Sequence, residues 1–204
     1  ALGVTAVGTA THVLTSNGVG VAPTFQAAAG GASAIDDLTD GYNDASSVGL
    51  GTNALANDDG TTNDNTAVGT SALAANTTGS MNVAIGKDCL LTNTTGSNNI
   101  GIGHSALSYN TTGSTNLGIG RNALRDNTTG TENISIGQNS SFATTTGGQN
   151  VVIGRTAFTT NTTGSNNVAV GFESLKANTT ASNNTAVGKE VLKANTTGDK
   201  NTAI

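Results

Sequence analysis

The chain has 204 residues, of which 10% are charged and 3% aromatic, with 28 glycines and a formal net charge of −5. An ordinary globular enzyme is about 25% charged, and a hydrophobic content of 35% with few large side chains cannot fill a conventional core for this length. Residues 1–64 hold seven acids and no Lys or Arg, whereas the rest holds 13 − 7 = 6 acids and all 8 basic residues. Nucleic acid binding needs a dense basic surface with aromatic platforms, so this composition excludes it.

Residues 1–26 are expected to form a small β module. Residues 11–16 alternate between apolar and polar, Asn17-Gly18 is a hairpin turn signal, and residues 19–25 return. No reactive group of residues lies in this segment, which favours a role as a structural joint or attachment module. His12 is interpreted as a strand or surface histidine, because no Cys, His or acid lies nearby at metal-ligand spacing.

Residues 27–46 are predicted to be a linker and an acidic loop. Residues 27–34, AAAGGASA, are small and flexible. Four acids follow within nine residues, and these could bind calcium or form a solvated loop, although the spacing lacks the EF-hand pattern. Residues 47–64 are predicted to be a degenerate first repeat that caps the open edge of the following structure. Gly51 lies 18 residues before Gly69, close to the 17-residue spacing of the later bend glycines.

From residue 65 to residue 204 the sequence has a 17-residue period, with eight complete blocks and the start of a ninth. A fixed short period is the signature of a chain that stacks one structural unit on the next. Each complete block opens with an asparagine: Asn65, Asn82, Asn99, Asn116, Asn133, Asn150, Asn167 and Asn184.

After its Asn, each block continues with a mostly branched, a usually small and a branched residue, a period of two that predicts a short strand with one face buried. A glycine ends each strand, which indicates a bend with positive φ or a crowded backbone. The next apolar segment, x-Ala-Leu, is either a second short strand or one turn of helix, and the block from Asn133 departs there, with Ser141 in the Leu column and Phe142 one step later. The closing Asn-Thr-Thr-Gly-Ser is turn chemistry. The bend glycines are Gly69, Gly86, Gly103, Gly120, Gly137, Gly154, Gly171 and Gly188.

These columns predict an all-β fold, a parallel β-solenoid or β-roll of 17-residue coils that stack about 4.8 Å apart. The interior of each coil is poor in large apolar side chains, so we expect the branched and small faces to be shared with other copies, in a homotrimer around the axis of the fibre. The stacked Asn columns are either ladders that hold the coils together or a polar binding surface.

One variable column, directly after the bend glycine, contains several basic residues. If the coils stack, it forms a surface stripe that either contacts an anionic surface polysaccharide or keeps the fibre soluble. The candidate ligand-binding residues of this basic stripe are Lys87, His104, Arg121, Arg155 and Lys189.

The sequence contains no arrangement typical of an enzyme, a cofactor site or a metal site. No Ser-His-Asp, paired-carboxylate or phosphate-loop pattern occurs, and GxG pieces such as GIGH belong to the repeat. Cys89 occupies a column that usually holds Ala, so it is interpreted as a small packing residue. Signal peptides and membrane-spanning runs are missing from these residues, and the absence of an initiator Met indicates a fragment or a processed chain.

The segments NVAIGKDC (82–89) and NLGIGRNAL (116–124) resemble the head repeats of trimeric autotransporter adhesins, which form trimeric parallel β-rolls with repeats of about 14 residues. The 17-residue form is more similar to the repeats of bacteriophage tail fibres, which often end in a self-cleaving chaperone domain that these residues do not contain. Residues 11–26, THVLTSNGVGVAPTFQ, resemble a segment at junctions between tail-fibre modules. The resemblance covers residues 47–204 and is specific for architecture.

The resemblance implies a structural shaft segment of a phage tail fibre, located in the virion and in contact with other tail or baseplate proteins. The shaft would act as a spacer, and a role in adsorption to host surface polysaccharide remains open. The alternative is a bacterial cell-surface adhesin or extracellular filament subunit, which a membrane anchor or export signal elsewhere would favour. Ice binding is disfavoured because most Thr lies in the turn, and an enzyme is the least favoured class.

Overall fold

A computed structural model of the chain describes residues 12–15, 24–27, 41–43, 46–59 and 63–204. The chain divides into two units, Ala1–Thr39 and Asp40–Ile204. In the first unit, strand β1 (His12–Thr15) pairs antiparallel with β2 (Thr24–Ala27). The hairpin turn predicted at Asn17-Gly18 lies outside the described residues. So do the four acids considered as calcium ligands, which are Asp36, Asp37, Asp40 and Asp44.

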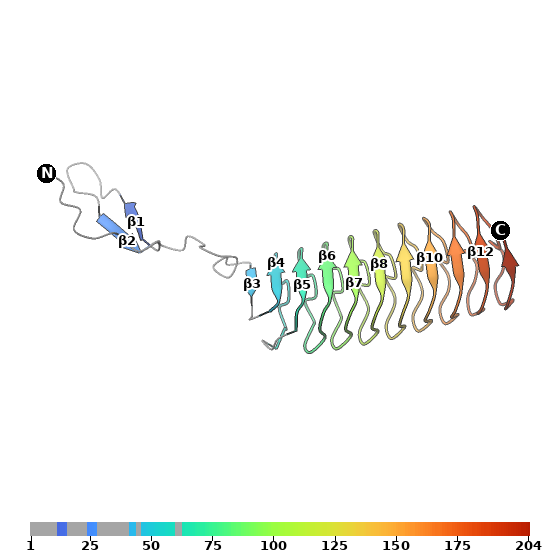
Figure 1. Cartoon of the computed structure of the whole chain (residues 1–204), viewed down its shortest axis with the longest axis horizontal. Helices are drawn as coiled ribbons and strands as arrows, with labels where there is room; N and C mark the ends of the chain where they lie inside the picture. The colour runs from blue at the N-terminus through green and yellow to red at the C-terminus, as the bar shows by residue number, and fades with distance from the viewer. Residues whose placement is uncertain (1–11, 16–23, 28–40, 44–45, 60–62) are drawn as a thin grey trace. The chain divides into compact units, whose positions relative to one another are not determined.

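The second unit is a parallel β-solenoid with one short strand in every coil (Figure 1). Strands β4 through β13 follow one another in chain order across the sheet, and each residue pairs with the one a whole block later, as Ala84 does with Gly101. The predicted all-β solenoid of 17-residue coils is therefore confirmed. The strands of this sheet are β3 (Gly41–Asn43), β4 (Val48–Leu50), β5 (Thr66–Val68), β6 (Val83–Ile85), β7 (Ile100–Ile102), β8 (Leu117–Ile119), β9 (Ile134–Ile136), β10 (Val151–Ile153), β11 (Val168–Val170), β12 (Thr185–Val187) and β13 (Thr202–Ala203).

The N-terminal edge of this sheet is covered by β3, which pairs antiparallel with β4, Gly41 opposite Leu50. This strand lies within the segment expected to be linker and acidic loop. An uncovered parallel edge would present a row of unpaired amides and carbonyls to other chains, and β3 occupies that row. The degenerate repeat contributes β4, whose Val48 pairs with Thr66 of β5.

The interior of the solenoid is formed by the small residue at the centre of each strand and by the Ala-Leu pair of the following turn. Ala67 and Ala84 are fully buried, as are Leu73 and Leu90. The branched residues on either side of the small one point out of the coil, and β7 alternates exposed, buried, exposed. The expectation that both faces would be shared with other copies is therefore wrong for the small face, since the coil itself buries it.

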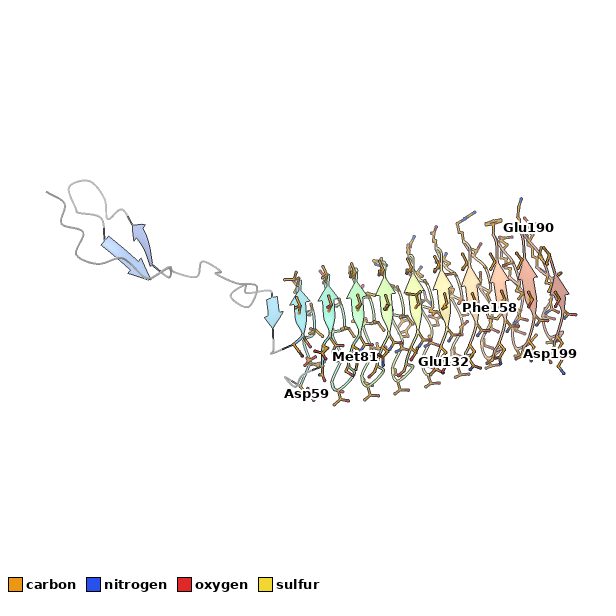
Figure 2. The ribbon with its side chains drawn as sticks, in the orientation of Figure 1. Asp59, Met81, Glu132, Phe158, Glu190 and Asp199 are labelled. Carbon is orange, nitrogen blue, oxygen red and sulfur yellow. The ribbon has the colours of Figure 1, made fainter. Side chains whose placement is uncertain are left out.

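The x-Ala-Leu segment is neither a strand nor a turn of helix but a sharp turn. Its leucines adopt the left-handed conformation, with φ of 51° at Leu73 and 52° at Leu107. This conformation is costly for a residue with a Cβ, so the full burial of these side chains compensates for backbone strain. Figure 2 shows Glu190 at the edge where the strands end and Met81 and Glu132 at the opposite edge, and both edges contain further positive-φ corners.

Candidate functional site

The predicted bend glycines form a column in which backbone lies directly on backbone. Gly103 has φ of 130°, and a Cβ added to it would lie 2.7 Å from the carbonyl carbon and oxygen of Gly120. The same relation links Gly86 to Gly103. These positions therefore set the stacking distance of the coils, and their role in the structure is packing.

The opening asparagines form a buried hydrogen-bonded ladder. The backbone N–H of Asn99 donates to Oδ1 of Asn82 at 2.9 Å, and its Nδ2 donates to Oδ1 of Asn82 at 3.2 Å and to the carbonyl of Gly113 at 2.8 Å. Each amide thus links one coil to the next and also spans its own coil. Because Asn82 and Asn99 are fully buried, of the two interpretations of these columns the geometry favours a structural ladder over a binding surface.

A second ladder runs through the Asn of the Asn-Thr-Thr-Gly turn. Nδ2 of Asn110 donates to Oδ1 of Asn93 at 2.7 Å and to the carbonyl of Gly113 at 2.9 Å. Thr144 occupies this column in the block from Asn133. As a consequence, Oδ1 of Asn127 is one of two buried side-chain polar atoms without a hydrogen bond in the described part of the chain, the other being Oγ of Ser174.

The basic stripe is assembled in one column, but its charges are partly paired. Lys87 lies 3.9 Å from Asp88, and Lys189 lies 3.7 Å from Glu190. The guanidinium of Arg155 lies over the Phe172 ring at 4.7 Å. His104 contacts Ser105 at 3.1 Å through Nδ1, and Arg121 is exposed. The stripe is therefore a weaker anion-binding surface than its sequence predicts, because acids in the next column offset two of its cations.

The outward face of the strands carries most of the exposed large hydrophobic side chains in the described residues. Ile85, Ile100 and Ile153 are each 40% exposed, and Ile102 and Ile134 are 36% and 37% exposed. They lie in the two branched columns of β6, β7, β9 and β10. The half-buried Leu117 and Ile119 of β8 fill the gap, so the two columns form one stripe, called here the strand face. Its central coils carry Ile, Leu and Val, whereas Thr66, Thr185 and Thr202 take the first branched position nearer its ends.

A second surface feature escaped the sequence reasoning, a stack of aromatic and guanidinium groups contributed by three successive coils. Arg125 lies 3.8 Å from the centroid of the Phe142 ring and 5.7 Å from that of Tyr109. Its Nε and Nη2 donate to the two carboxylate oxygens of Asp126, at 2.7 Å and 3.1 Å. The available signal was the appearance of Tyr109, Arg125 and Phe142 in two neighbouring columns of three successive blocks, since no other block holds an aromatic residue in these columns.

The last coils are joined by an ion-pair cluster. Glu173 accepts hydrogen bonds from Lys176 of its own coil and contacts Lys193 of the next, both at 2.5 Å. These hydrogen bonds, first from Lys176 and then from Lys193, lower the pKa of Glu173 from 4.5 to about 2. The same contact with Glu173 raises the pKa of Lys193. The cluster therefore links two successive coils.

The lone cysteine is a packing residue in this geometry. Cys89 is fully buried, and its burial raises the pKa of the thiol to about 12, which leaves it a neutral, unreactive thiol at neutral pH. In the described residues, three or more His, Cys, Asp or Glu side chains nowhere gather as metal ligands would. The same residues include no helix with the length and apolar character to span a membrane.

Comparison of the chain with protein-family models, with curated proteins and with solved structures gave no match.

Proposed function

We propose that this chain is a structural shaft segment of a bacteriophage tail fibre, in which three copies associate in parallel through the strand face. The observation that carries the proposal is the outward stripe of Ile, Leu and Val, which holds most of the exposed large hydrophobic side chains in the described part of the chain. A contiguous exposed apolar stripe is typical of a protein interface. Removing the isoleucines from water would stabilise each copy by roughly 25 cal/mol per Å² of apolar surface buried.

The lean interior supports the same assembly. Most coils bury a small residue at the centre of the strand and a small residue followed by Leu in the next turn, as in the coil with Ala84, Cys89 and Leu90. Each coil also holds the residue of the Leu column, which is Leu except at Ser141 and Phe158, in a strained left-handed turn. A shaft built in this way gains the missing apolar burial from its neighbours, since cyclic symmetry brings the same column of each copy to the common axis.

As a shaft segment the protein acts as a spacer. Its coils add length in equal steps, its β3 strand ends one side of the sheet, and the first unit serves as a joint to tail or baseplate proteins. The basic stripe lies beyond the bend glycines, outside the strand face, so it remains available for adsorption to a host surface polysaccharide.

The mass of the protein in solution tests the assembly. Sedimentation equilibrium at micromolar concentration should give three times the single-chain mass of 20.0 kDa. A mass of 20.0 kDa that persists at high concentration would reject the trimer.

The location of the protein tests its proposed role as a tail-fibre shaft segment. Gold-labelled antibody against the protein should mark the tail fibres of phage particles in electron micrographs. Label on the bacterial envelope in cells that release no particles would instead support the adhesin or extracellular filament.

Exchange of Lys87, Arg121, Arg155 and Lys189 for Gln tests the adsorption role of the basic stripe. Unchanged binding of the variant to host cells would exclude the stripe as an adsorption surface.

A further inference from the structure

The coil from Asn133 to Gln149 breaks the pattern on which stacking depends. Hydroxyl groups replace apolar or amide groups in its buried columns: Ser135 at the strand centre, Ser141 in the Leu column and Thr144 in the second Asn ladder. Oγ of Ser135 donates to Oγ of Ser140 at 2.6 Å, so part of this polar interior is satisfied internally. The apolar core divides here, since one cluster extends from Ala54 to Leu124 and the other begins at Val152.

The same coil places an aromatic side chain on the surface. Phe142 follows Ser141, so the block has its large apolar residue one position later than the others, where it lies partly exposed beneath the Arg125 guanidinium. Tyr109, from the coil on the other side of Arg125, is 49% exposed. Asn122 and Asn139 lie in the turns of these coils and share a 2.9 Å hydrogen bond. The aromatic-guanidinium patch therefore consists of Tyr109, Arg125, Asp126 and Phe142.

Loss of core packing at the coil that builds the patch points to a function there. Sequences depart from their own structural pattern mainly at sites where function opposes stability. We propose that the patch binds the neutral sugar units of a polysaccharide, an activity that goes beyond the structural role of the shaft.

The chemistry of the patch fits a sugar better than other ligands. A sugar ring has an apolar C–H face, which packs on an aromatic ring, and hydroxyl groups that both donate and accept hydrogen bonds. The Asp126 carboxylate can accept from two hydroxyls, and the Arg125 guanidinium can donate to others. Arg125 and Asp126 cancel in charge, so the patch does not select anions.

Other classes of partner fit less well. Three coils extend about 10 Å along the axis, whereas a stable protein interface buries roughly 800 Å² on each partner. Single-stranded nucleic acid needs a positively charged groove along its backbone, which this neutral patch does not supply. A polysaccharide requires neither a large buried area nor a positively charged groove. Weak contacts with single sugar units add up when several copies of the patch engage one polysaccharide chain.

The test uses the full chain on an array of immobilised neutral hexose and N-acetylhexosamine oligosaccharides, with uronic-acid and sialic-acid oligosaccharides beside them. We expect retention on at least one neutral class, and a loss of at least tenfold in affinity in Phe142→Ala and in Tyr109→Ala. Circular dichroism and the oligomer mass should be unchanged in both variants, because these side chains lie on the surface. Each patch lies within one polypeptide chain, so a monomer is expected to bind the same oligosaccharides, with a lower apparent affinity than a trimer because it carries a single patch.

Two matched variants separate binding from structure. Phe172→Ala removes the aromatic of the other ring-guanidinium pair, which lies in the basic stripe, and should leave neutral binding intact. Thr144→Asn restores the ladder beside the patch and should raise the melting temperature without changing binding. Retention of no neutral oligosaccharide, retention of acidic ones alone, or equal binding by Phe142→Ala and the original protein would each overturn the proposal.

Discussion

At the scale of single residues, the two buried Asn ladders explain how so polar a chain holds a fixed stack. Asn is usually a surface or turn residue, yet Asn82, Asn99 and Asn110 are fully buried. Each is tolerated because its amide group donates and accepts across coils, so that no polar atom is left without a partner where the column is intact. Such a ladder is specific as well as stabilising, since a coil out of register would leave its amides unpaired.

Thr144→Asn tests the ladder at the point where it is broken. An Asn at this position would donate its Nδ2 hydrogen to the orphaned Oδ1 of Asn127 and replace the weak 3.4 Å contact between Asn161 and Thr144. We expect the free energy of unfolding to rise by about 1 kcal/mol, which raises the melting temperature by about 2–4 °C. The reverse change in an intact column, Asn110→Thr, serves as the control and should lower it. No rise in Thr144→Asn would mean that the orphaned oxygen is already bound to water.

At the scale of the coil, the sequence predicts what is periodic and misses what is strained. The strand, the bend glycine and the 17-residue step follow from alternation and from the invariance of Gly between blocks. The left-handed turn at the Leu column does not follow from the sequence pattern. Leu rarely adopts positive φ, and no neighbouring residue favours that conformation at Leu107. Burial decides that conformation, and burial is a property of the closed coil. The outward direction of the branched residues was likewise unpredictable, since alternation fixes two faces without saying which one is enclosed.

The candidate surfaces were predictable to different degrees for a similar reason. The basic stripe is a single column and can be read from one position of the repeat. The aromatic-guanidinium patch combines neighbouring columns of three coils, so its members come together only when the coils are stacked at a known register. Pairing of Lys87 with Asp88 and of Lys189 with Glu190 also depends on side-chain direction at the corner, which the period does not give.

Gly103→Ala tests the bend column. The new Cβ would sit at φ of 130° and 2.7 Å from the Gly120 carbonyl, so the coils must separate or the backbone must change conformation. We expect a loss of at least about 2 kcal/mol in the free energy of unfolding, measured by denaturant titration. Gly118→Ala is the matched control, because its Cβ would meet Leu107 at 3.2 Å in a column that holds Ala in other coils. Equal losses in the two variants would refute a special role for the bend.

Glu173→Gln tests how the last coils are joined. The pKa of Glu173 is lowered to about 2 in the folded chain, so its ion pairs stabilise the fold above its ordinary pKa of 4.5 and are lost as the pH falls from about 4.5 through 2. The original protein should melt slightly above the Gln variant at pH 7, and the two should converge by pH 2. The difference is expected to be small because the partner lysines face solvent. A gap that stays constant with pH would show that the carboxylate charge is not involved.

At the scale of the whole molecule, the solenoid is a structure whose apolar residues face in two directions. The inward set closes each coil, and the outward set lies on the strand face. In an isolated chain the outward set stays exposed to water and contributes little to stability. In a fibre of parallel copies both sets would be buried, because the strand face would add apolar burial that the narrow coil cannot supply. Stability of the coil and association of the copies are therefore expected to be coupled.

Ile102→Lys tests that coupling. Ile102 is 36% exposed in the single chain, so a lysine can be accommodated there without entering the coil interior. In a trimer three lysine ammonium groups would meet near the axis, where desolvation and like-charge repulsion oppose association. Sedimentation equilibrium should show the mass falling from that of three chains towards the 20.0 kDa of one. The melting temperature should fall and lose the dependence on protein concentration that association confers on the trimer. Thr112→Lys places the same charge on the exposed turn and should change neither quantity. A variant that dissociates but melts as the original protein does would show that each coil stack is stable alone, and a variant that keeps its mass would remove the strand face from the interface.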